Sequence, residues 1–150
     1  MKSELTDEPT WIVDPIDGTT NFVHGIPCSC ISIGICVDKV PVIGVVLNPF
    51  LNTIYTAIKG QGAYKNGTKL PLNKTQLGGI NSCVFVTEWG TSRKGINFDI
   101  KRETFSTLLA EECNGGKMVH GLRMNGSAAL NLCGVAEGVY DGYWECGPWE

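Results

Sequence analysis

Two aspartates and a threonine stand close together near the start of the chain, in the stretch WIVDPIDGTTNF. Asp14 and Asp17 supply carboxylates and the carbonyl of Ile16 lies between them, so three hard oxygen donors can converge within one turn. Mg²⁺ prefers such ligands and often shares its shell with a substrate phosphate. The pattern indicates a magnesium site beside a phosphate site, although D-x-x-D-G-T taken alone is more often an Asp-rich turn with a capping aspartate.

The residues before and within this motif predict how the donors are positioned. Trp11, Ile12 and Val13 form an aromatic and β-branched run that is typical of a buried strand. Pro15 disfavours the helical conformation at Asp14 and lacks an N–H, so we expect the strand to stop there and the chain to turn. The turn would bring Asp17 back to the side of Asp14.

A short helix is expected from about Gly18 to His24, with Asp17 at or near its N-cap. The first N–H groups of a helix have no partner inside it, and they attract anions. Gly18 and Thr19 could therefore hold a phosphate.

The rest of the chain predicts two groups of strands. β-rich runs at 28–37, 42–47 and 53–58 are joined by links too short for helical crossovers, so they should pair antiparallel, and KNGT around Asn66 is a type I′ hairpin signal. After a loop at about 72–79, the pattern predicts strands at 82–87, 118–123 and 139–145 and helices at 98–112 and 127–136. The apolar residues of the first of these helices, predicted to face the core, are Phe98, Phe105, Leu108 and Leu109.

Composition narrows the functional class without identifying it. With 150 residues, 43% of them hydrophobic, the chain can bury one core as a single domain or part of one. A net charge of −3 and a pI near 5.4 argue against a nucleic-acid surface, and no membrane span or signal peptide is visible, so a cytoplasmic location is the default. The seven cysteines include Cys28, Cys30 and Cys36 at one parity, which favours buried reduced thiols over a zinc cluster.

The run WIVDPIDGTTNFVH resembles the first signature of the inositol monophosphatase family, the Mg²⁺-dependent, lithium-sensitive phosphomonoesterases. The resemblance continues through IPCSCISIGICVDKVPVIGVVLNPFLNTIYTAIKGQGAYKNG to RMNGSAALNLCGVAEGVYDGYWE. It implies an α/β fold, a layered αβαβα sandwich of the sugar-phosphatase type with a mainly antiparallel first sheet, truncated at both ends. Residues 1–77 would carry the metal site and residues 78–150 the substrate site.

The resemblance also implies the chemistry, which is Mg²⁺-dependent hydrolysis of inositol monophosphate to inositol and phosphate by a metal-activated water. The ligand would be a small sugar or inositol phosphate, and the full-length parent would be a homodimer. The implied metal ligands are Asp14, Ile16 and Asp17; the catalytic residues are Asp17 and Thr19; the substrate-binding residues are Asp17, Gly18, Thr19, Ser127, Ala128 and Glu145.

The resemblance is incomplete at both ends. The family's Gly-Glu-Glu segment would precede Met1, and its Trp-Asp motif would follow Glu150, so two metal-ligand segments are missing from this sequence. We therefore expect the 150-residue chain alone to bind Mg²⁺ weakly, to show negligible phosphatase activity and to be poorly soluble as a monomer.

Two other interpretations stay open. A truncated homologue could act as a non-catalytic binding or interaction module, because the visible ligand set is incomplete. An aspartyl-nucleophile phosphatase of the haloacid dehalogenase type also has D-G-T after a strand, but its aspartates are two residues apart and its parallel sheet needs helical crossovers, which the run after His24 does not provide.

Overall fold

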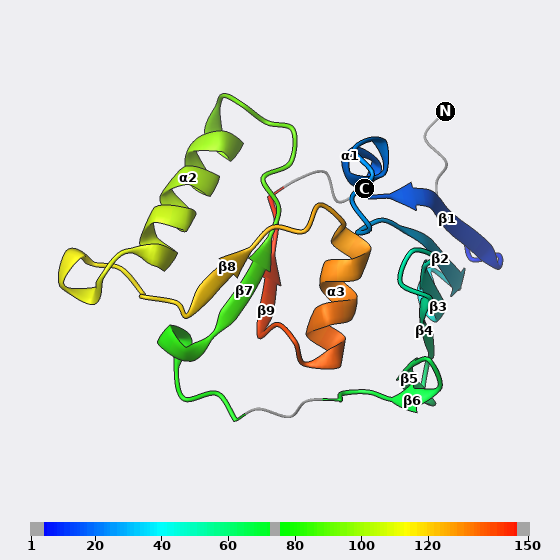
Figure 1. Cartoon of the computed structure of the whole chain (residues 1–150). Helices are drawn as coiled ribbons and strands as arrows, with labels where there is room; N and C mark the ends of the chain where they lie inside the picture. Colours follow the sequence, from blue (N-terminus) through cyan, green and yellow to red (C-terminus); the bar gives the residue numbers. More distant parts are fainter. Residues whose placement is uncertain (1–4, 73–75, 147–150) are drawn as a thin grey trace.

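The computed structural model describes residues 5–72 and 76–146, and Figure 1 shows these residues in layers. A six-stranded antiparallel sheet is followed by helix α3 (Ala128–Glu137), then by a three-stranded parallel sheet, and then by helix α2 (Ile96–Leu109). The predicted α/β sandwich with an antiparallel first sheet is confirmed.

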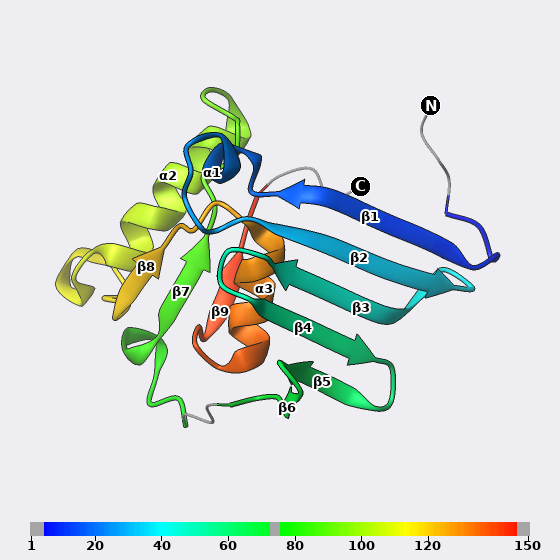
Figure 2. The same ribbon diagram turned by 45° about the vertical axis from the view of Figure 1, so that its right-hand side comes forward.

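The first sheet has its strands in sequence order, each antiparallel to the next (Figure 2). Its members are β1 (Thr10–Asp17), β2 (Cys30–Val37), β3 (Val40–Asn48), β4 (Thr53–Ile58), β5 (Gly62–Lys65) and β6 (Thr68–Lys69). Asn66 and Gly67 join β5 to β6 with φ of 47° and 80°. Positive φ at both residues is what a type I′ turn requires, so this predicted hairpin is confirmed.

The second sheet is parallel because helices provide its crossovers. Its order is β8 (Gly121–Arg123), β7 (Val84–Thr87), β9 (Gly142–Trp144). Helix α2 connects β7 to β8 and α3 connects β8 to β9, and the two helices lie on opposite faces of the sheet (Figure 1). Two short 3₁₀ helices, Ile80–Ser82 and Glu112–Asn114, stand where the sequence predicts the start of a strand and the end of a helix. Residues 73–75 of the predicted loop lie outside the described residues.

Strand β1 does not stop at Asp14, which corrects the sequence prediction. It continues to Asp17 through a β-bulge, in which two residues of β1, Pro15 and Ile16, stand opposite one residue of β2. Pro15 lies on an edge strand of the sheet, where a missing N–H is tolerated.

Helix α2 packs on the parallel sheet through aromatic side chains. The ring centroid of Trp89 lies 5.5 Å from that of Phe98 and 5.2 Å from that of Phe105, and Phe105 contacts Trp144. The prediction that Leu109 faces the core is wrong, because it is 57% exposed at the last turn of the helix.

The two faces of the antiparallel sheet differ in what covers them. One face carries the aligned residues Ser32, Val46 and Tyr55, which line a hollow between the sheet and α3. The opposite face carries the aligned residues Trp11, Ile35, Ile43 and Ile58. No described element covers this outer face, and Trp11 is 66% and Ile58 45% exposed.

The three cysteines at alternating positions, predicted to be buried thiols, are mostly buried. Cys30 and Cys36 are buried and Cys28 is half-buried, and all are free thiols. Within residues 5–72 and 76–146, helices are all too short or too polar to cross a bilayer.

Candidate active site

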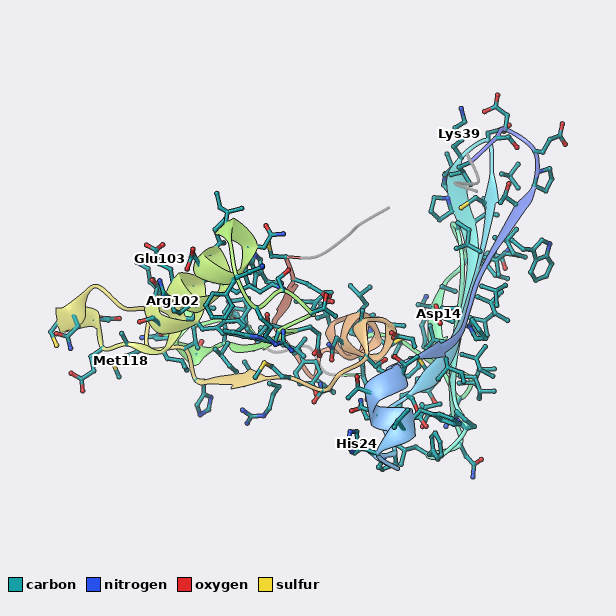
Figure 3. The ribbon with its side chains drawn as sticks, turned by 90° about the horizontal axis from the view of Figure 1, so that it is seen from above. Asp14, His24, Lys39, Arg102, Glu103 and Met118 are labelled. Carbon is teal, nitrogen blue, oxygen red and sulfur yellow. The ribbon has the colours of Figure 1, made fainter. Side chains whose placement is uncertain are left out.

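The β-bulge in β1 brings the two aspartates to one face of the sheet. In a regular strand, residues three apart point to opposite faces. Here Asp14 pairs with Ser32 and Asp17 pairs with Cys30, two residues that share a face of β2. The extra residue in β1 therefore aligns both carboxylates on the side that faces α3, and Figure 3 shows Asp14 where β1 passes this helix.

One carboxylate oxygen of Asp17 is held by the N-terminal end of α3. Its Oδ2 accepts hydrogen bonds from the Ser127 hydroxyl at 2.6 Å and the Ala129 amide at 2.8 Å, and the Cys30 thiol lies 3.8 Å away. Ser127 is the N-cap of α3 and also accepts from the amide of Leu130. Asp17 thus places its charge at the positive end of this helix.

Asp17 lies next to the N-cap of the helix that follows it, within the range that the sequence predicts. The N-cap position belongs to Gly18, in the left-handed conformation with φ of 81°, and α1 runs from Thr19 to Val23. A Cβ on Gly18 would lie 2.8 Å from the carbonyl oxygen of Cys28. Only glycine fits between the backbone carbonyl of Cys28 and the side chain of Ser127, and Thr19 beside it is exposed.

Asp14 and Ile16 lie along the bulge itself. The Oδ1 of Asp14 accepts from the Ile16 amide at 3.1 Å, a local turn that orients the exposed carboxylate. The side chain of Ile16 lines a small apolar hollow with Phe22 and Phe50.

A cleft of about 630 Å³ opens beside Asp17. Ala128, from the first turn of α3, and Glu145, just after β9, line the same cleft. Glu145 accepts a hydrogen bond from the hydroxyl of Tyr143. The structure therefore brings Asp17 and Gly18 to the start of α3, where Ser127 and Ala128 lie. Glu145 lines the same cleft as Asp17, and Asp14 and Ile16 lie next to Asp17 in β1.

The charges that line this cleft are mainly negative. Asp17, Glu88 and Glu145 contribute carboxylates and Arg93 contributes a guanidinium, which donates to the Gly90 carbonyl. Burial raises the pKa of the Tyr143 hydroxyl, and the hydrogen bond and charge of Glu145 and then the charges of Glu88 and Asp17 raise it further. An anionic ligand in such a cleft needs a cation to offset the carboxylates.

Two residues that the sequence did not single out hold the site together. Glu88, for which the sequence suggests no role, accepts from the amides of Asn125 and Gly126 just before α3. Asn21 donates to the carbonyls of Cys28 and Asn125 at 2.6 Å each. The Glu88 contacts and the contact of Asn21 with Asn125 join residues 37 to 104 positions apart, which a local sequence pattern cannot reveal.

The donors fit part of a metal shell. Asp14, Asp17 and the Ile16 carbonyl are hard oxygen ligands on one short stretch of β1. In the part of the chain that the structure describes, no three His, Cys, Asp or Glu side chains gather closely enough to form a metal site by themselves. Further oxygen ligands, such as water or phosphate, would be needed to complete the shell.

The comparisons with known proteins agree with this geometry. A family model described as the inositol monophosphatase family matches residues 1–150. Inositol monophosphatase 2 of Saccharomyces cerevisiae is 46% identical over 98% of this chain and 50% of its own length. The extragenic suppressor protein suhB from Bartonella henselae superposes with a TM-score of 0.80 at 34% identity, over 93% of this chain and 50% of that one. A crystal structure described as inositol monophosphate bound SaIMPase-II superposes with a TM-score of 0.70 at 31% identity, over 95% and 50%. The chain spans about half the length of the relatives it matches.

Proposed function

Since the chain belongs to the inositol monophosphatase family, we propose that it supplies the metal and phosphate residues of an enzyme that hydrolyses inositol monophosphate to inositol and phosphate with Mg²⁺. The observation that carries the proposal is the β-bulge, which aligns Asp14 and Asp17 on one face while α3 holds a single oxygen of Asp17. Among the described residues no donor reaches the other oxygen of Asp17, which is available to a cation.

The metal would be held by Asp14, Asp17 and the Ile16 carbonyl. When bound, Mg²⁺ neutralises phosphoryl charge and makes a coordinated water acidic enough to attack phosphorus. The Asp14 carboxylate is oriented by the Ile16 amide, and Asp17 by Ser127 and Ala129, so neither has to reorganise to bind the ion.

The phosphate is assigned to Gly18 and Thr19. Gly18 lets the backbone turn sharply after Asp17 without a side chain in the way, and the exposed hydroxyl of Thr19 is free to hold and orient a water. The family resemblance supports both roles.

The inositol ring is assigned to the part of the cleft lined by Ala128 and Glu145. Ser127 and Ala128 start α3, and Ala128 lines the cleft at the helix end where N–H groups lack partners inside the helix. Glu145 lines the same cleft and can accept from ring hydroxyls. SaIMPase-II, a structural neighbour, is described with inositol monophosphate bound, which supports a ligand of this class.

The test uses a hybrid in which residues 1–150 replace the matching segment of yeast inositol monophosphatase 2, the 46%-identical relative. We expect the hybrid to release phosphate from inositol monophosphate only when Mg²⁺ is present. Turnover that persists with a chelator would reject the metal role. Failure of a folded hybrid to turn over, with the yeast enzyme active in parallel, would favour the non-catalytic alternative.

The haloacid dehalogenase alternative is not carried further. The chain belongs to a different family, and the strands after the aspartate motif form an antiparallel sheet.

A further inference from the structure

One carboxylate oxygen of Glu88 joins the end of β7 to the start of α3. Glu88 Oε1 accepts from the Gly126 amide at 2.7 Å, the Asn125 amide at 3.0 Å and the side-chain amide of Asn131 at 2.7 Å. Asn131 is fully buried in α3. Hydrogen bonds to a carboxylate are shorter and stronger than those between neutral groups, so this oxygen is a firm anchor for the Asn125–Gly126 turn.

The same turn is held from its other side by Asn21. The Asn21 side-chain amide donates to the carbonyl of Asn125 at 2.6 Å. A Cβ on Gly126 would lie 2.6 Å from that amide nitrogen, and Gly126 has φ of 79°. The turn is therefore held from two sides, by Glu88 and by Asn21, and a side chain at position 126 would collide with Asn21.

The residues that follow the turn are the donors to Asp17. Ser127, directly after Gly126, is fully buried and donates to Asp17 Oδ2, and Ala129 donates to the same oxygen. A displacement of the turn moves both donors together. The contacts thus form one path, from Glu88 through Gly126 and Ser127 to Asp17.

We propose that Glu88 is a positioning residue of the active site, which fixes the Asn125–Gly126 turn and, through Ser127 and Ala129, aims the free oxygen of Asp17 at the metal. The inference rests on the proposed metal role of Asp17. It gives a role to a cleft carboxylate that is not itself among the proposed ligands.

The test compares Glu88→Asp with Glu88→Gln in the hybrid. Aspartate is one methylene shorter and withdraws the acceptor from the turn, whereas glutamine keeps an acceptor oxygen at the same reach. Substitution of groups that orient metal ligands costs about 10- to 100-fold in metal affinity. We therefore expect Glu88→Asp to weaken Mn²⁺ binding, followed by electron paramagnetic resonance, by about tenfold or more. We expect Glu88→Gln, which keeps the acceptor and loses only the charge, to weaken it clearly less.

Other outcomes overturn the inference. Equal large losses in both variants would make Glu88 a direct metal ligand, and unchanged Mn²⁺ affinity in both folded variants would leave it a purely structural residue. Amide hydrogen exchange at Ala129 provides a second readout, and we expect it to accelerate in Glu88→Asp only. If the unaltered hybrid binds no Mn²⁺, the proposed function fails by itself, and the Ala129 exchange rate still decides whether Glu88 acts through the turn.

Discussion

The hydroxyl of Ser127 donates a hydrogen bond of 2.6 Å to Oδ2 of Asp17, between residues 110 positions apart in sequence. Ser127 is fully buried, so the donor of this bond is shielded from water, whereas Asp17 lines the cleft. Among the residues that the structure describes, no donor reaches the other oxygen, Oδ1. The contact therefore fixes the Asp17 carboxylate with one oxygen occupied by protein and the other available to a cation, and several consequences can be measured.

Replacing Asp14 by asparagine should remove most turnover in the hybrid. A neutral amide cannot supply the charge that a carboxylate gives to a cation, and metal ions contribute several kcal/mol to stabilising the transition state. We expect phosphate release from inositol monophosphate to fall more than about hundredfold, which is the rate equivalent of such an energy. The matched control is Asp38→Asn, an exposed aspartate at the β2–β3 turn. Wild-type rates in Asp14→Asn would remove Asp14 from the site.

Replacing Glu145 by glutamine should separate substrate choice from chemistry. Glu145 lines the same cleft as Ala128 of α3, and its proposed role is to accept from inositol hydroxyls. Turnover of inositol monophosphate should fall more than that of 4-nitrophenyl phosphate, which has no ring hydroxyls to lose contact with. Glu103→Gln, on the exposed surface of α2 (Figure 3), serves as the control. Equal losses on both substrates would reject the assignment.

The sequence predicts the elements of the fold better than their connections in space. Regular alternation and short links were sufficient for the antiparallel sheet, and Thr53–Ile58 was predicted with its observed bounds. The bulge was not, because Pro15 is compatible both with a strand end and with an edge strand that absorbs an extra residue. Asp14 and Asp17 were expected to lie on the same side, which is correct. The expected cause was a turn after the strand, whereas the structure has a bulge within it.

From residue types and spacing the candidate site was predictable only where it is local, and the distant residues Ser127, Ala128 and Glu145 came from the family resemblance. Asp14, Ile16, Asp17 and Gly18 are neighbours in sequence, whereas the cap of Asp17 by Ser127 and the anchor at Glu88 join segments that meet only in the folded chain. A glutamate that binds backbone amides has no residue-type signature. The homodimer, the cytoplasmic location and a boundary near residue 77 stay predictions, since a single chain does not test them.

Gly18→Ala should destabilise the fold through a specific collision. Left-handed backbone disfavours any side chain, and the Cβ would lie 2.8 Å from the carbonyl oxygen of Cys28. Gly25→Ala is the matched control, because Gly25 also has positive φ but meets nothing within 4 Å. Strain of this kind costs about 1–3 kcal/mol, so urea unfolding of the hybrid should show a larger loss of free energy for Gly18→Ala than for Gly25→Ala. Equal losses would mean that the contact with Cys28 relaxes.

The thiol of Cys133 should resist alkylation at neutral pH. Burial is the main cause that raises the pKa of Cys133 from 9.0 to about 12, and the negative charges of Cys30 and Glu137 add to it. The nucleophilic thiolate is therefore scarce at neutral pH. Cys113 is exposed and should react with iodoacetamide first. Mass spectrometry of the labelled peptides measures both. Labelling of Cys133 as fast as Cys113 in the folded protein would contradict the burial.

The same pKa shift makes stability depend on alkaline pH. Because the folded state holds the Cys133 proton more tightly than the unfolded state, its contribution is fully present below about pH 9 and is lost as pH rises toward about 12. Urea unfolding should therefore give a falling free energy over this range. Cys133→Ala should make the fall less steep, and an unchanged slope would assign the loss to other groups.

The 150-residue chain alone should associate and should not turn over substrate. Trp11, Val13, Ile43 and Ile58 expose an apolar face of the first sheet that no described element covers, and faces of this kind promote association. Sedimentation velocity of this chain should show oligomers or aggregates. The double variant Trp11→Thr with Ile58→Thr should increase the monomer fraction, since both side chains lie on the outer face of the first sheet.

The 150-residue chain also offers few oxygen donors for a metal, so Mg²⁺ should bind weakly in calorimetry and phosphate release should be negligible. The hybrid, which adds the flanking segments of the yeast relative, should be soluble and active. A soluble monomer of the 150 residues with steady inositol monophosphate turnover would show that the donors already described suffice.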